Sequence, residues 1–195
     1  MNLGLVTSFI IAGMLMILIV TLNNTRGHHS ADITLHSMSQ THVGTISDII
    51  QHDFTKIGYN YLEPVPEAIE VADENEIRFR SNLTNDPSGT TQLITWKLSE
   101  DQMANSGNPR HRTLVRTIDG DETDITLGVS RFELFYYIAG NEAPLTFPIS
   151  QADRENINRI EVVLEVEPRE GTGRNNRYTT STWRKVFTPP NLNLI

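Results

Sequence analysis

LGLVTSFIIAGMLMILIVTL, from Leu3 to Leu22, is an unbroken apolar stretch, and no charged side chain occurs before Arg26. A helix of about 20 residues spans the ~30 Å hydrocarbon core of a bilayer with every backbone group bonded inside the segment. The main alternative is a secretory signal peptide, which has a basic region, a shorter apolar stretch and a small-residue cleavage site. Only Met1 and Asn2 precede the stretch here. We therefore expect a single uncleaved transmembrane anchor helix over residues 1–25.

A second helical pattern follows the anchor. Apolar residues recur at intervals of three and four, with Ser47, Asp48, Gln51 and Asp53 between them on the expected polar side. This spacing predicts an amphipathic helix with one face for a core. No proline occurs before Pro64, so nothing forces a break from the anchor, and we expect an amphipathic continuation over residues 26–62 that ends at Gly58, Pro64 and Pro66. The residues expected to pack this helix on the head are Ile46, Ile49, Ile50, Phe54 and Ile57, with Tyr61 following at the same spacing.

The rest of the chain, residues 63–195, is predicted to be an antiparallel β-sheet head, because its apolar residues alternate with polar ones. In the clearest case one face holds Ile160, Val162, Leu164 and Val166, and the other holds Glu161, Glu165 and Glu167. A short helix is expected after Ser150, capped by that side chain, with Asp153 at the third position. The fold class is therefore α+β. The predicted strands are 76–81, 92–99, 112–119, 129–139, 158–167 and 180–188.

Composition and motifs exclude several functions. The net charge of -8 argues against nucleic-acid binding, and the absence of cysteine removes disulfides and thiolate metal sites. No nucleophile motif, phosphate loop or dinucleotide fingerprint occurs, so we expect no enzyme, no cofactor and no small-molecule substrate. The acidic group from Asp119 to Asp124 could supply oxygen ligands for Ca²⁺, but a solvated turn is favoured. The histidines, including His28, His29 and His111, are expected to be solvated polar residues rather than metal ligands.

Two further patterns suggest contacts between molecules. Gly4, Ser8 and Ala12 recur at every fourth position of the anchor, which would let a second membrane helix approach closely. In the head, acidic residues gather between Glu63 and Glu76, and basic residues between Arg169 and Lys185. Either these segments are two solvated faces, or they meet between neighbouring subunits and set their orientation.

The layout resembles that of type IV pilins and of the pseudopilins of type II secretion, in which a membrane helix continues into an amphipathic helix and a sheet head. The stretch ISDIIQHDFTKIGYNY, residues 46–61, is similar to the minor pilin and pseudopilin segment in which an aspartate precedes a Gly-Tyr helix end. The order VSRFELFYYIAG and then INRIEVVLEVE is similar to the paired strands late in those heads. Counted from Leu5, Phe9 stands where the family has a glutamate, a departure also found in some minor pseudopilins at filament tips.

This resemblance implies a structural subunit of a pilus-like or pseudopilus-like filament, a minor one, that assembles through its N-terminal helix. The assembly residues would be Gly4, Ser8, Phe9, Ala12 and Gly13, and the partners the membrane and other pilin-like subunits. It also implies a bacterial inner-membrane protein with its head outside the cytoplasm, or a surface filament, although Arg26 alone weakly favours a cytoplasmic head. The alternatives are a membrane-tethered binding module and an accessory subunit of a larger membrane complex that does not polymerise.

Overall fold

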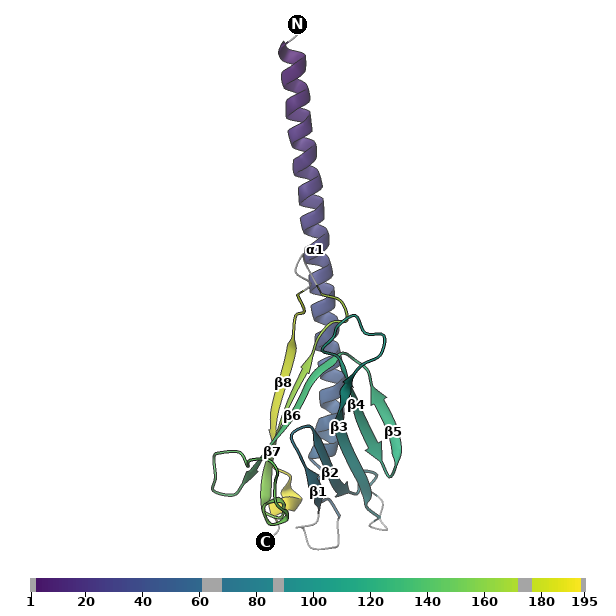
Figure 1. The fold of residues 1–195 in the computed structure, drawn as a ribbon, viewed down its shortest axis with the longest axis vertical. Coiled ribbons are helices and arrows are strands. Elements are labelled where there is room, and N and C mark those ends of the chain that lie inside the picture. Colours follow the sequence, from purple (N-terminus) through teal and green to yellow (C-terminus); the bar gives the residue numbers. More distant parts are fainter. Residues whose placement is uncertain (1–2, 61–67, 86–89, 172–176, 194–195) are drawn as a thin grey trace.

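The protein is one long helix carrying a head of two antiparallel sheets. The computed structural model describes residues 3–60, 68–85, 90–171 and 177–193, and for residues 3, 5 and 24–32 only the backbone is described. Helix α1 runs from Leu3 to Phe54, 52 residues. Its N-terminal half projects away from the head, and its C-terminal half lies against the sheets (Figure 1). The α+β class, with an N-terminal apolar helix and antiparallel sheets, is confirmed.

Helix α1 is continuous across the expected join between anchor and amphipathic segment. It ends at Phe54, before the expected limit at residue 62, because the following turn leads to Gly58, whose φ is +72°. The Gly58 N–H bonds the carbonyl oxygen of Arg80 at 2.9 Å, so the chain is turned toward a strand there. Tyr61, Pro64 and Pro66 lie outside the described residues.

The first sheet, sheet A, is a meander in which each strand pairs antiparallel with the next. Three of its five strands were predicted. The first and last were missed, the last because its residues are acidic and lack an apolar alternation. The acidic group is therefore a hairpin turn plus a strand: Asp119 and Gly120, with φ of +51° and +95°, form the two-residue turn. The strands are β1 (Ile69–Ala72), β2 (Glu76–Ser81), β3 (Gln92–Gln102), β4 (Arg112–Ile118) and β5 (Asp121–Ile125).

The second sheet, sheet B, contains the three C-terminal strands, all predicted, in the order β6-β7-β8. A short helix α2 (Gln151–Arg154) joins the first two, and the Ser150 hydroxyl accepts the Asp153 N–H at 3.1 Å, as expected of the cap. We expected one sheet and find two, because the buried end of α1 lies between them and is covered from both sides. The strands are β6 (Val129–Ile138), β7 (Ile157–Val166) and β8 (Ser181–Phe187), followed by the 3-10 helix η2 (Pro190–Asn193).

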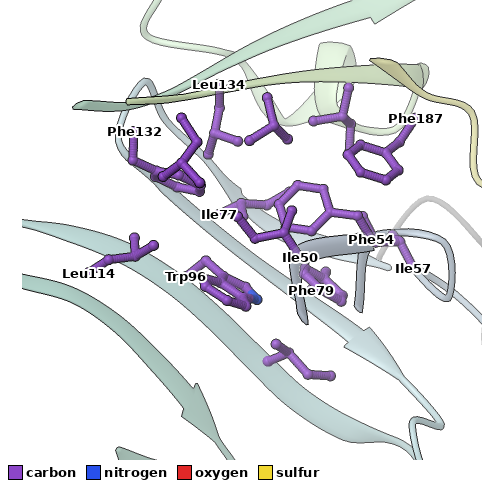
Figure 2. Close-up of a cluster of buried hydrophobic side chains, with 14 of the residues drawn as sticks. Ile50, Phe54, Ile57, Ile77, Phe79, Trp96, Leu114, Phe132, Leu134 and Phe187 are labelled. Atoms are coloured by element: carbon purple, nitrogen blue, oxygen red, sulfur yellow. The ribbon is translucent and has the colours of Figure 1, made fainter. Parts of the chain in front are cut away.

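The core is built where α1 meets both sheets (Figure 2). The Phe54 ring lies 5.8 Å from the ring of Phe79 in sheet A and 5.3 Å from that of Phe187 in sheet B, centroid to centroid. Trp96 of sheet A stacks on Phe132 of sheet B at 6.4 Å. All five side chains are buried. The end of the helix is therefore an integral part of the head core.

Candidate functional site: the projecting helix and its attachment

The projecting half of α1 is an uncovered apolar surface. Residues Val6–Asn23 have a mean hydropathy of 2.2, and none of this window is buried in the chain. The side chains are large and bare: Phe9 is 73% exposed and Ile17 70%. By length and composition this segment can cross a membrane, as an anchor or as a signal sequence. Such a surface needs lipid or other helices around it, because water penalises exposed apolar area.

The five predicted assembly residues all lie on this bare segment. A Cβ added at Gly4 or Gly13 would meet nothing within 4 Å, so both positions are open on the helix surface. Phe9, Ser8 and Ala12 are exposed as well. Among the residues that the structure describes, no other element lies against them.

The hydroxyls within the bare segment are satisfied by the helix itself. Ser8 Oγ donates to the carbonyl oxygen of Gly4 at 2.9 Å, and Thr7 Oγ1 donates to the same oxygen at 3.0 Å. Thr21 Oγ1 donates to the carbonyl oxygen of Ile17 at 2.8 Å. A hydroxyl that donates to the backbone of its own helix leaves no unsatisfied hydrogen-bond donor in lipid or in a packed helix interface. The segment therefore presents an apolar exterior despite these polar residues.

The predicted helix-to-head residues lie at the other end of the helix. Ile46, Ile50, Phe54 and Ile57 are fully buried, and Ile49 is half-buried at the margin of the same cluster. Ile57 lies just beyond the end of α1, and Figure 2 shows it beside Phe54 in the core. This end of α1 is thus fixed by burial, whereas the other end is bare.

A buried ion pair fastens the helix end to sheet A. The Asp53 carboxylate is fully buried and accepts two hydrogen bonds from Arg116 on β4, from Nε at 2.7 Å and from Nη2 at 2.9 Å. The Trp96 indole N–H donates to it at 3.0 Å, and His52 Nδ1 lies 3.1 Å away. Placing Asp53 on the polar face was therefore wrong. A buried carboxylate is tolerable only because charged and neutral donors surround it.

Sequence reasoning missed Arg116 because its strand shows no clean alternation. The register nevertheless places Trp96 directly opposite Arg116, and Leu114 shares the face of Arg116 two residues before it. Since Leu114 is fully buried, that face is the core face. A guanidinium at a core position needs an anion, and this is the signal that could have pointed to Asp53.

A second buried polar cluster joins the β3–β4 loop to the end of β7. His111 is 1% exposed, so its placement among solvated histidines was wrong. Its Nε2 lies 3.1 Å from the Glu167 carbonyl oxygen, and its Nδ1 lies 2.7 Å from the Ser106 hydroxyl oxygen; in the neutral ring Nε2 donates to the carbonyl and Nδ1 accepts from the hydroxyl. The Asn108 amide donates to the Glu167 carboxylate at 2.8 Å, and Arg110 pairs with that carboxylate at 3.0 Å. Burial lowers the pKa of His111 and so favours the neutral ring.

This cluster borders a cavity of about 260 Å³ at the point where α1 enters the head. The serine hydroxyl donates to the histidine ring, but both ring nitrogens are engaged and the ring is buried, so the contact braces the loop. The cavity was missed because its walls come from separate segments of the chain. Its lining includes Leu35, Met38, Met103, His111, Leu127 and Arg169.

The charged segments singled out in the sequence are partly used inside the head. Glu70 pairs with Arg80 at 2.8 Å, and Glu76 pairs with Lys97 at 2.9 Å, while Glu63 and Glu67 lie outside the described residues. Within the described part of the chain, no group of three or more His, Asp or Glu residues is arranged to hold a metal ion. Comparisons with protein-family models, with curated proteins and with solved structures found no match for this chain.

Proposed function

We propose that this chain is a structural, minor pilin-like or pseudopilin-like subunit that assembles into a filament through α1. Before assembly the bare half of α1 lies in the bacterial inner membrane with the head outside the cytoplasm. On assembly it leaves lipid for the helices of neighbouring subunits. Because one apolar environment replaces another, little hydrophobic free energy changes, and close packing of small residues and polar matching of heads decide the outcome.

The observation that supports this proposal is that one half of a continuous helix is exposed while the other half is buried in the head. Residues Val6–Asn23 are wholly bare, whereas Ile46, Ile50 and Phe54 of the same helix are wholly buried in the head. A head fixed to its helix in this way cannot turn independently of it. Any packing of helices between copies therefore also sets how the heads are oriented.

Cysteine cross-linking through α1 tests the proposal, and the chain has no cysteine of its own to interfere. Ser8→Cys is compared with Ile10→Cys, which faces away from it because each residue turns a helix by about 100°. We expect oxidation to cross-link Ser8→Cys more than Ile10→Cys, in native membranes and in material sheared from the cell surface. Ser8→Leu should abolish the association without changing the amount of protein in membranes, since leucine is well accepted in lipid.

Other outcomes identify the alternatives. Monomer alone with both cysteines would indicate a tethered module or an accessory subunit and would contradict the filament. Equal cross-linking at both positions would refute the small-residue stripe as the contact. A mature N-terminus beyond residue 23, found by sequencing, would show a removed signal peptide.

A further inference from the structure

Two of the sheet edges, those formed by β5 and β8, lie on opposite sides of the head (Figure 1), and the other edge of sheet A is β1. Strand β5 is the last strand of sheet A and β8 the last of sheet B, and Figure 1 shows them flanking the head. The inner edge of β6 is already engaged, since the Leu134 N–H bonds the Glu74 carbonyl oxygen and the Leu145 N–H bonds that of Tyr136, both at 2.8 Å. An outer edge presents backbone groups to which another strand can pair.

The two outer edges carry opposite charge. Strand β5 holds three exposed carboxylates in five residues, Asp121, Glu122 and Asp124, and no ion pair of the described residues includes any of them. Strand β8 holds Arg184 and Lys185 and no carboxylate. Arg184 pairs with Glu161 of β7, yet its side chain is 66% exposed, and Lys185 bonds the neutral amide oxygen of Gln51. One edge is therefore acidic and the other basic.

The two strands also run in opposite directions relative to α1. Strand β5 passes Thr123, opposite the Arg116 that binds Asp53, and leads to Leu127, whose carbonyl oxygen lies 3.1 Å from His42 Nδ1. It thus runs toward the projecting half of α1. Strand β8 runs away from it and ends at Phe187, which packs on Phe54. When two copies lie side by side with parallel helices, β5 of one is antiparallel to β8 of the other.

We propose that the β5 edge of one copy pairs antiparallel with the β8 edge of the next, an inference that rests on the proposed function. Like charges on facing strands are unfavourable, so β5 against β5 and β8 against β8 are disfavoured, while β5 against β8 is favoured. Pairing two different surfaces leaves one free edge of each kind at the ends. Such heterologous contacts continue from copy to copy and form a ring or an open filament.

Two single-cysteine full-length chains, tagged to differ in size and co-expressed in membranes, test this pairing. One carries Thr123→Cys on β5, and the other carries Thr182→Cys, Arg184→Cys or Val186→Cys on β8, which covers the neighbouring registers. We expect disulfides between chains of different size for at least one register, with few between identical chains. Glu142→Cys, exposed in the loop between β6 and α2 and part of neither edge strand, is the matched control. Cross-links no greater than this control in any register would overturn the proposal.

Charge reversal supplies an independent measurement. One variant makes β5 basic (Asp121→Lys, Glu122→Lys, Asp124→Lys), and a second makes β8 acidic (Arg184→Glu, Lys185→Glu). Each variant alone should lose about tenfold in head cross-linking, which corresponds to about 1.4 kcal/mol, because like charges then face each other across the two strands. Their mixture should regain it, because the basic β5 of one faces the acidic β8 of the other.

The cysteine at residue 8 separates failure of this inference from failure of the proposed function. Association through Ser8→Cys without any rescue on mixing would refute the edge pairing and leave the filament proposal standing, with the edge charges serving to keep heads apart. Absence of association at both places would contradict both.

Discussion

Replacing Arg116 with methionine would leave the Asp53 carboxylate buried without its guanidinium partner. Arg116 donates two of the hydrogen bonds to this carboxylate, and Trp96 and His52 are left as the other contacts. Breaking a buried ion pair from one side costs about 3–5 kcal/mol. The free energy of unfolding of a domain of this size is only about 5–15 kcal/mol, so a loss of this size should be readily measurable.

The assay is urea unfolding of the detergent-solubilised full chain, followed by tryptophan fluorescence. Trp96 reports directly, since its indole N–H donates to the same carboxylate. Adding Asp53→Asn to Arg116→Met should regain about 2 kcal/mol, because a neutral amide needs no counter-charge and can still accept from the indole. A loss below about 1 kcal/mol for Arg116→Met, or a double variant no more stable than the single one, would refute the assigned role of the ion pair.

Three other predictions concern the head. Phe54→Ala should cost about 3–5 kcal/mol of unfolding free energy, against little for the exposed Thr55→Ala, and equal losses would contradict its role between the sheets. Burial lowers the pKa of His111, so below about pH 6.5 the unfolded chain binds a proton at this ring more readily than the folded chain does. The free energy of unfolding should therefore fall as the pH is lowered from 7.5 to 5. His111→Gln should make the free energy of unfolding depend less on pH over this range. Gly128 has a φ of +84°, and a Cβ added there would lie 2.5 Å from the Glu167 carbonyl oxygen, whereas a Cβ at Gly140 would meet open space. Gly128→Ala should therefore cost more unfolding free energy than the roughly 1–2 kcal/mol expected for Gly140→Ala. Equal losses for the two variants, measured by calorimetry, would refute the clash.

The helix and most strands could be predicted because the spacing of their apolar residues indicates which face is buried. The residues Ile46, Ile50 and Phe54 repeat at helical spacing for this reason, and they are buried. Strand β5 could not be predicted, since an edge strand with exposed acidic side chains leaves no apolar alternation. Its pairing is fixed by the local Asp119–Gly120 turn and by the register with β4, not by its own side chains.

The attachment site escaped prediction for a related reason. Asp53 looks polar by itself, and only the fold brings Arg116 and Trp96, far along the chain, to its carboxylate. The same holds for His111, whose burial depends on Glu167 at the end of another strand. Patterns within one segment show which face is apolar, but buried polar pairs between segments depend on topology.

The continuity of α1 also has a mechanical consequence. At about 1.5 Å per residue its 52 residues form a rod of ~78 Å, with no loop between the bare half and the head core. Tension on the anchored end would be transmitted straight to the aromatic rings and the Asp53–Arg116 pair. The strands lie lengthwise beside the rod (Figure 1), so this load acts in shear along their contacts. Extracting the rod would require these contacts to break together, and the head would resist force far better along this axis than across it.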